Sequence, residues 1–131
     1  DTILPKGLLV YTEDKNGKRE EEWADDPDCI NVPMVVLVNG NSASASELFT
    51  GALKDYDKAE IIGTTTYGKG IVQNFISLND GSAVKVTSSE YFTPKGVAIH
   101  GVGVEPDIVV EYDAEAEADN QLQIAIDYLS N

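Results

Sequence analysis

An apolar run that ends in a turn constrains the fold of this chain more than any other stretch. Residues 32–40 read VPMVVLVNG, a β-branched run without polar alternation, which is typical of a strand buried on both faces. Residues 44–55 follow almost at once and place Leu48, Ala52 and Leu53 on one helical face. A strand, a tight loop and a helix in this order predict an α/β fold with 32–40 as its central strand.

Shorter segments predict further strands around this one. Residues 7–12 read as a strand, and the Asn-Gly pair that follows them predicts a hairpin turn. Residues 20–28, EEEWADDPD, are charged and contain a proline, so they predict a solvated loop. Another strand is expected to end at Gly63, and residues 71–92 read as two strands joined by a glycine turn. We therefore expect a mixed sheet with packed helices.

The C-terminal segment predicts a second helix. Residues 119–129 place Leu122, Ile126 and Leu129 on one face, and we expect this apolar face to dock on the body of the protein. With 131 residues and 42% hydrophobic composition, the chain is long enough for one compact domain. The sequence therefore predicts a single unit over residues 1–131.

Charge and hydropathy argue against nucleic-acid binding and against a membrane-spanning segment. The formal net charge is −14, from 23 acidic and 9 basic side chains, whereas nucleic-acid binding requires a basic surface. No stretch of about 18 apolar residues is present, so the chain is expected to be soluble. The N-terminal DTILPKGLLVY also lacks the basic-then-apolar order of a signal peptide.

The single cysteine and the single histidine limit the chemistry further. Cys29 has no second cysteine to pair with, and His100 adds too few ligands for a structural zinc site, so we expect no metal and no cofactor. A Cys29/His100 catalytic pair is formally conceivable. The acidic residues before Cys29 disfavour it, because negative neighbours oppose formation of the reactive thiolate.

Residues 40–49, GNSASASELF, contain three serines at alternate positions: Ser42, Ser44 and Ser46. The simplest interpretation is structural, since Ser44 and Glu47 have the spacing of a capping box at a helix N-terminus. A second interpretation is catalytic, because a loop between a buried strand and a helix exposes backbone N–H groups that stabilise an oxyanion. The segment has no G-x-S-x-G motif, which disfavours the α/β-hydrolase fold.

A nucleophilic serine needs a base, and the sequence offers two. One is His100, which would make a Ser-His-Asp arrangement. The other is Lys69 in TTTYGKGIVQNF, where glycines and apolar residues favour the burial that turns a lysine into a neutral amine. A solvated turn lysine is the structural alternative at this position.

Three blocks carry a resemblance to a known family. VVLVNGNSASASELFTGALKD, GTTTYGKGIVQ and YFTPKGVAIHGVGVEPDI together resemble the carboxyl-terminal processing proteases, the tail-specific serine peptidases with a Ser-Lys pair. The blocks occur in the family's order and extend from about Val32 to the final helix. The resemblance implies a core like that of the ClpP and crotonase folds.

The resemblance also implies roles for individual residues. It makes Ser44 the nucleophile and Lys69 the general base, with Tyr67 where the family more often has phenylalanine. It makes Gln73 the residue that supports the lysine, and the amide of Ala45 one oxyanion donor. Along a regular strand Lys69 and Gln73 would lie roughly 13 Å apart, so we expect either a bend at the neighbouring glycines or a lysine side chain that runs along the strand.

The same resemblance implies the setting of the protein. The substrates would be proteins or peptides with apolar C-termini. The full-length protein would be extracytoplasmic, either periplasmic or membrane-anchored. It would be compatible with a homo-oligomeric assembly. Relative to the family, residues 1–131 lack the PDZ domain and the first part of the protease core, which contributes the second oxyanion donor. We therefore expect a protease fragment that is inactive alone, with a non-catalytic peptide-binding or assembly module as the alternative.

Overall fold

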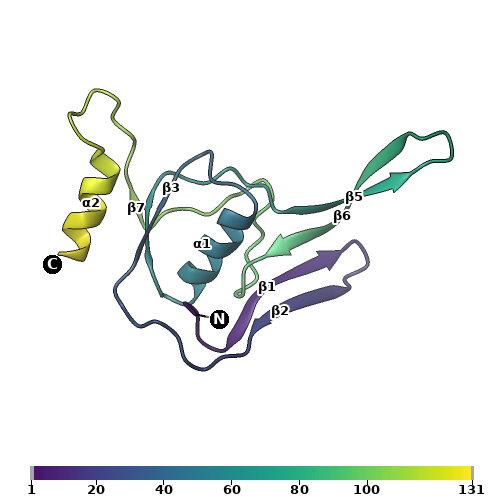
Figure 1. Ribbon diagram of the computed structural model, residues 1–131, viewed down its shortest axis with the longest axis horizontal. Coiled ribbons are helices and arrows are strands. Elements are labelled where there is room, and N and C mark those ends of the chain that lie inside the picture. The colour runs from purple at the N-terminus through teal and green to yellow at the C-terminus, as the bar shows by residue number, and fades with distance from the viewer. Residues whose placement is uncertain (1, 131) are drawn as a thin grey trace.

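The structure, a computed structural model, describes residues 2–130 and arranges them as two sheets and two helices (Figure 1). Within those residues the strands are β1 (Gly7–Asp14), β2 (Arg19–Ala24), β3 (Val35–Val38), β4 (Glu60–Gly63), β5 (Ile71–Ser77), β6 (Ala83–Phe92) and β7 (Ile108–Val109). The helices are α1 (Ala45–Asp55) and α2 (Asn120–Leu129). The α/β fold class is confirmed, with parallel and antiparallel strands in separate sheets.

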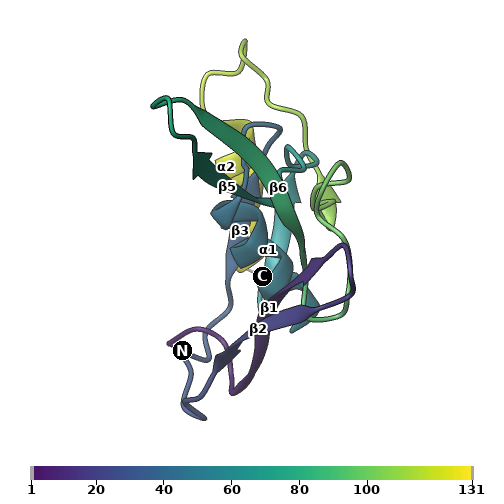
Figure 2. The same cartoon turned by 90° about the vertical axis from the view of Figure 1, so that its right-hand side faces the viewer.

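The antiparallel sheet has the strand order β2-β1-β6-β5. The predicted hairpin joins β1 to β2 through Gly17, whose φ of 79° is a conformation that glycine adopts readily. A second predicted hairpin joins β5 to β6 and projects from the body (Figure 1). In the turned view, β6 runs as one long strand from its partner β5 to its partner β1 (Figure 2).

The parallel sheet has the order β3-β4-β7, which corrects one prediction. Residues 32–40 were expected to form the central strand, but β3 is an edge strand in which Leu37 is exposed. The central strand is β4, where Ile61 and Ile62 are fully buried. The reason is a pairing over long sequence distance, since β7 aligns with β4 and leaves the outer side of β3 unpaired.

The helices lie on opposite sides of the parallel sheet (Figure 1). Helix α1 packs against β1 and β4, and α2 packs against β3 and β4. The main apolar cluster is centred on α1: buried Leu4, Ala52 and Leu53, with Ile3, Leu9, Val36, Tyr56 and Ala59 packed against them. Burial of a side chain such as Leu53 stabilises the fold by about 1.5–3 kcal/mol. This core packs the C-terminal half of α1 against the rest of the protein.

Residues 20–28 were predicted to be a solvated loop, and for most of this segment the prediction is wrong. Strand β2 covers Arg19–Ala24 and pairs with β1 at the edge of the antiparallel sheet. Glu20, Glu21 and Glu22 are exposed on it. A charged edge strand is a common device against edge-to-edge aggregation, so here charge marks an edge and not a loop.

Helix α2 forms as predicted but docks through a different face. Leu122, Ile126 and Leu129 are exposed, whereas Gln121 and Ala125 are buried. The docked side is also fixed by hydrogen bonds: Gln121 Nε2 donates to Val110 O (2.7 Å), and Tyr128 Oη donates to Glu60 Oε2 (2.8 Å). The small Ala125 allows close approach to the sheet, which the larger leucines would prevent. Neither helix within residues 2–130 is long and apolar enough to cross a bilayer.

Candidate active site

Ser44 is exposed in the loop between β3 and α1 and has an unusual backbone conformation. Its φ is 58° and its ψ is −119°, a region that residues other than glycine rarely occupy and keep only where surrounding bonds determine it. The loop before it is tightly bonded, because Asn39 N–H donates to Ser42 Oγ (3.1 Å) and Ser42 N–H donates to Asn39 O (2.8 Å). The loop therefore presents Ser44 in a strained conformation at the start of α1.

The first turn of α1 contains the predicted capping-box pair Ser44 and Glu47. The glutamate half of the box is formed, since Ser44 N–H donates to Glu47 Oε2 (2.8 Å), and the N–H of Glu47 donates to the backbone carbonyl of Ser44 (2.8 Å). Ala45 is the first helical residue. At this position a backbone N–H has no acceptor within the helix, so it points toward whatever lies beyond the helix end.

The loop between β4 and β5 carries Lys69 to the same place. Gly68 N–H donates to Glu47 Oε1 (2.6 Å), and Lys69 N–H donates to Glu47 Oε2 (2.8 Å). Tyr67 N–H donates to Ser42 O (2.9 Å), which ties the two loops together directly. The structure therefore brings the backbones of Ser44 and Lys69 to one shared carboxylate.

A third segment, residues 99–104, supports the lysine loop. Val104 N–H donates to Thr66 Oγ1 (2.7 Å), and Gly101 N–H donates to Gly68 O (2.9 Å). The backbones approach so closely that a Cβ on Gly103 would lie 2.5 Å from Thr66 O. We call residues 44–47, 66–69 and 99–104 the Glu47 junction.

Glu47 is the electrostatic centre of this junction, with 0% of its surface exposed. Burial raises the pKa of its carboxyl, but hydrogen bonds from Thr66, Gly68, Lys69 and Ser44 lower it by more. The pKa therefore lies below its ordinary value of 4.5. At neutral pH the carboxylate is ionised and accepts from all four donors.

Lys69 itself is exposed, and it precedes β5, which begins at Ile71. The chain turns at Gly68, where φ is 85°, and the pairing of β5 with β6 shifts register between Val72 and Gln73. Residues 69–73 are therefore not one regular strand, since Lys69 precedes β5 and the register shift interrupts the pairing before Gln73. Gln73 Nε2 donates to Thr87 Oγ1 on β6 (3.3 Å).

The cysteine and the histidine lie apart from each other. His100 is exposed at the turn behind the lysine loop, where its backbone N would lie 2.6 Å from a Cβ on Gly70. Cys29 lies near a different lysine, with Lys58 Nζ 3.7 Å from its sulfur. Among residues 2–130, no group of three or more His, Cys, Asp or Glu side chains is arranged to hold a metal ion.

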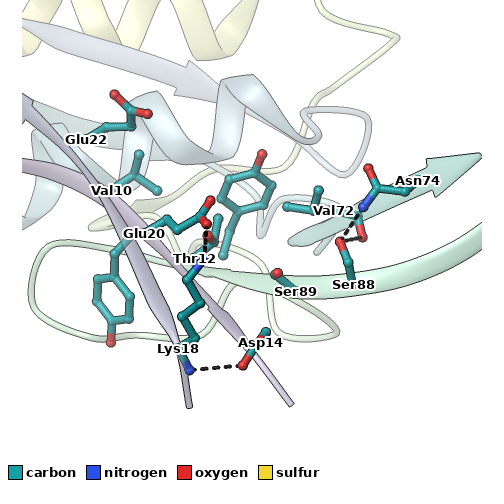
Figure 3. A pocket seen from close by; sticks show the side chains of 12 residues that line it. Val10, Thr12, Asp14, Lys18, Glu20, Glu22, Val72, Asn74, Ser88 and Ser89 are labelled. Carbon is teal, nitrogen blue, oxygen red and sulfur yellow. Dashed lines mark hydrogen bonds and ion pairs between the residues drawn. The ribbon is translucent and has the colours of Figure 1, made fainter. Parts of the chain in front are cut away.

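The antiparallel sheet has a separate cavity of about 500 Å³, drawn in Figure 3. Its walls come from β1, β2, β5 and β6 and include Thr12, Glu20, Val72, Asn74 and Ser88. Some polar side chains there bond to each other, as where Asn74 Nδ2 donates to Ser88 Oγ (3.0 Å) (Figure 3). Ser44, Lys69 and Gln73 are not among the described residues that line this cavity, and Ser44 and Lys69 are exposed at the Glu47 junction.

Comparison with known proteins identifies the family. A model of peptidase family S41 matches residues 1–110. The chain belongs to this family. The S41 chain is 53% identical over 115 residues to a carboxy-terminal-processing protease of Bartonella bacilliformis, covering 85% of this chain and 26% of that protein. It is 40% identical over 133 residues to a carboxyl-terminal-processing protease of Synechocystis sp., covering 97% of this chain and 31% of that protein.

Solved structures agree with this assignment. The photosystem II D1 C-terminal processing protease is 43% identical with a TM-score of 0.79, over 84% of the S41 chain and 29% of that protein. The tricorn protease, at 23% identity and a TM-score of 0.56, shares the fold. The resemblance to carboxyl-terminal processing proteases is confirmed, and the S41 chain spans less than a third of the length of these relatives.

Sequence reasoning missed two residues of the Glu47 junction. It assigned Glu47 only to the cap of α1, and it did not single out Thr66, which is buried and donates to Glu47 Oε1 (2.5 Å). The available signal was weak: a threonine in the TTTYG segment, before the lysine, whose role depends on a carboxylate distant in sequence.

Proposed function

We propose that this S41 chain is the C-terminal part of the catalytic core of a serine endopeptidase, over residues 1–131. In this proposal Ser44 is the nucleophile and Lys69 the general base. Gln73 supports the lysine, and the N–H of Ala45 donates to the oxyanion. The complete enzyme cleaves proteins near apolar C-terminal tails.

One observation supports these roles above the others. The N–H groups of Ser44 and Lys69 donate to the same oxygen of Glu47, at 2.8 Å each. Two loops that are far apart in the sequence therefore meet at the residues that the family resemblance selects. The strained backbone of Ser44 adds support, because strain of this kind is concentrated at functional sites.

The chemistry is acyl transfer. The neutral amine of Lys69 accepts the proton of the Ser44 hydroxyl while Oγ bonds to a peptide carbonyl carbon, and the Ala45 N–H donates to the resulting oxyanion. The tetrahedral intermediate collapses, the C–N bond breaks, and the protonated lysine returns the proton to the leaving amine. Water then loses a proton to Lys69 and attacks the ester, which frees Ser44 and the new carboxylic acid.

Ser44 and Lys69 are both exposed in this structure, and that exposure sets a condition on activity. A lysine acts as a base only when it is unprotonated, and removal from water favours the neutral amine. We propose that the part of the S41 relatives beyond this chain supplies this cover together with a second oxyanion donor. The chain alone is then expected to be weakly active or inactive, since one lost donor costs about 100- to 1000-fold.

The preference for apolar tails and an extracytoplasmic location of the full-length protein are proposed from family membership. A homo-oligomer is compatible with that membership. The formal net charge of −14 also disfavours nucleic acid as a substrate.

A second candidate function is a non-catalytic peptide-binding or assembly module. It is favoured by the sheet edges, because β3 and β5 each have one partner strand in their sheets. An extended peptide can add to such an edge through backbone hydrogen bonds. This function requires neither the hydroxyl of Ser44 nor the amine of Lys69.

The test is hydrolysis of an unstructured protein with an apolar C-terminal tail. The chain is assayed alone and inside a full-length S41 host in which it replaces the matching segment, beside Ser44→Ala, Lys69→Ala and His100→Ala. The proposal expects Ser44→Ala to lower turnover in the host by at least about 10⁴-fold, as removal of a serine nucleophile does. Lys69→Ala should be comparably inactive and His100→Ala nearly unchanged.

Other outcomes contradict the proposal in distinct ways. Loss of activity in His100→Ala, with Lys69→Ala still active, would instead favour a Ser44/His100 hydrolase. Saturable peptide binding that survives Ser44→Ala, with no turnover at any pH, would favour the binding module. Turnover should also fall as the pH is lowered, because a protonated lysine cannot accept the serine proton.

A further inference from the structure

Glu47 is a fully buried carboxylate that the proton transfer proposed above does not use. It lies in the first turn of α1 with 0% of its surface exposed. Burial of a carboxylate without partners is strongly unfavourable, so proteins keep one only where hydrogen bonds replace its water shell. The partners of Glu47 therefore indicate what its burial stabilises.

The four donors to Glu47 come from two loops. Oε2 accepts the N–H groups of Ser44 and Lys69, at 2.8 Å each. Oε1 accepts the N–H of Gly68 at 2.6 Å and the hydroxyl of Thr66 at 2.5 Å. One donor belongs to the serine loop and three to the lysine loop, so most of this hydrogen bonding is unrelated to capping the helix.

Thr66 extends the arrangement to the third segment of the junction. Its hydroxyl donates to Glu47 and accepts the N–H of Val104 at 2.7 Å. A hydroxyl has one hydrogen to donate and lone pairs to accept, so Thr66 fits between a carboxylate and an N–H. Through Thr66, the lysine loop is therefore bonded to Glu47 in α1 and to the backbone of Val104.

We propose that Glu47 is the positioning residue of the Ser44 and Lys69 pair, and that Thr66 completes its effect. The carboxylate holds the strained backbone of Ser44 and the backbone of Lys69 against one group, which fixes the two loops relative to each other. This inference rests on the proposed function for the roles of Ser44 and Lys69. The arrangement of the two loops around Glu47 is testable without it.

A residue that only caps α1 would behave differently. Its loss would release the N–H of Ser44 and weaken the helix, and it would leave Gly68 and Lys69 unaffected. A positioning residue must instead release the lysine loop as well. The amides of Gly68 and Lys69 therefore distinguish the two roles.

The first experiment measures amide hydrogen exchange in the 131-residue chain by NMR, in wild type and Glu47→Gln. Glutamine matches glutamate in shape, but its NH₂ group cannot accept a hydrogen bond. The amide of Gly68 or that of Lys69, according to the orientation of the glutamine, should exchange at least about tenfold faster through local opening. Unchanged exchange at both amides, in a folded variant, overturns the proposal.

Threonine variants supply a matched control. Thr66→Val should accelerate exchange at Gly68 and at Val104, and Thr66→Ser, which keeps the hydroxyl, should restore the wild-type rates. Thr50→Val changes another buried threonine, in the middle of α1, and should leave these amides as they are. This series tests the positioning role even if Glu47→Gln does not fold. Equal changes in amide exchange in Thr66→Val and Thr50→Val would contradict the proposal.

The second experiment measures turnover in the full-length host that carries this chain. Glu47→Gln is expected to lower kcat about 100-fold, the effect of a misplacement of about 1 Å, while KM changes less than about threefold. Thr66→Ser should retain most of the activity that Thr66→Val loses. An unchanged kcat in Glu47→Gln overturns the positioning role, whereas an absence of Ser44-dependent turnover in wild type contradicts the proposed function and leaves the exchange result to decide this inference.

Discussion

The Glu47 junction and the β5–β6 hairpin are neighbours in the chain, yet they are held together in opposite ways. The junction joins three segments through buried hydrogen bonds centred on Glu47 and Thr66. The hairpin begins at Ile71 and projects from the body (Figure 1). Along it β5 has β6 as its partner strand, and Phe75 is 71% exposed.

The hairpin is formed by residues that are close in sequence, whereas the junction is formed by residues that are far apart in sequence. The hairpin depends on alternating residues and a glycine turn, which are close in sequence. The junction depends on a carboxylate that is useful only when all of its donors arrive together. Changes in the junction should therefore affect the whole molecule, and changes in the outer hairpin should remain local.

The largest expected effect comes from the core behind the junction. Leu53 on α1 is 1% exposed, so Leu53→Ala should lower the free energy of unfolding by about 2–5 kcal/mol, through lost burial and the cavity left behind. The matched change in the hairpin, Phe75→Ala, should alter it by no more than about 0.5 kcal/mol. Urea unfolding followed by circular dichroism measures both, and similar losses from the two variants would contradict the comparison.

Two glycines allow the same substitution to be compared in the junction and in the hairpin. The expected difference in the free energy of unfolding is somewhat smaller than for the core substitution. Gly103 in the junction and Gly81 at the hairpin tip both have positive φ, 77° and 87°. A Cβ on Gly103 would lie 2.5 Å from Thr66 O, whereas one on Gly81 would meet nothing within 4 Å. Gly81→Ala should cost about 1–2 kcal/mol for the backbone conformation alone. Gly103→Ala should cost about 1–3 kcal/mol more through overpacking, and equal thermal shifts would show that the junction yields to the added methyl group.

The smallest expected effect on stability is the pH dependence of the contribution of Glu47. The pKa of Glu47 is lower in the folded protein than its ordinary value of 4.5, so its stabilising contribution is fully present above pH 4.5 and is lost as the pH falls through the folded-state pKa. The difference in Tm between wild type and Glu47→Gln should therefore shrink as the pH is lowered from 6 toward 3.

The hairpin supplies the control for that titration. Hydrogen bonds from the Ser82 hydroxyl and backbone also lower the pKa of Asp80, but this carboxylate is exposed at the hairpin turn. Solvent screens such a group, so Asp80→Asn should follow the wild-type Tm at each pH. A constant difference for Glu47→Gln across the same range would show that its burial, and not its charge, stabilises the junction.

Local sequence patterns predicted most of the helices and strands correctly. They did not predict which strands pair or which helix face packs against the sheet. The strands ending at Gly63 and within 71–92, the first hairpin and both helices were predicted from turn residues and apolar spacing, and all are present. The position of 32–40 in its sheet was wrong because that depends on which strand β7 pairs with. The docking face of α2 was wrong because Ala125 fits closely against the sheet and the larger Leu122 remains outside.

The sequence by itself selected Ser44, Lys69, Gln73 and Ala45 as candidates, through the resemblance of three blocks of the chain to the carboxyl-terminal processing proteases. It also determined the capping box, since the spacing of Ser44 and Glu47 is local. Only the tertiary structure decided that the same glutamate accepts the amides of Gly68 and Lys69. The physical reason is that a buried carboxylate takes whichever donors the fold brings to it, and those donors come from loops that sequence spacing does not relate.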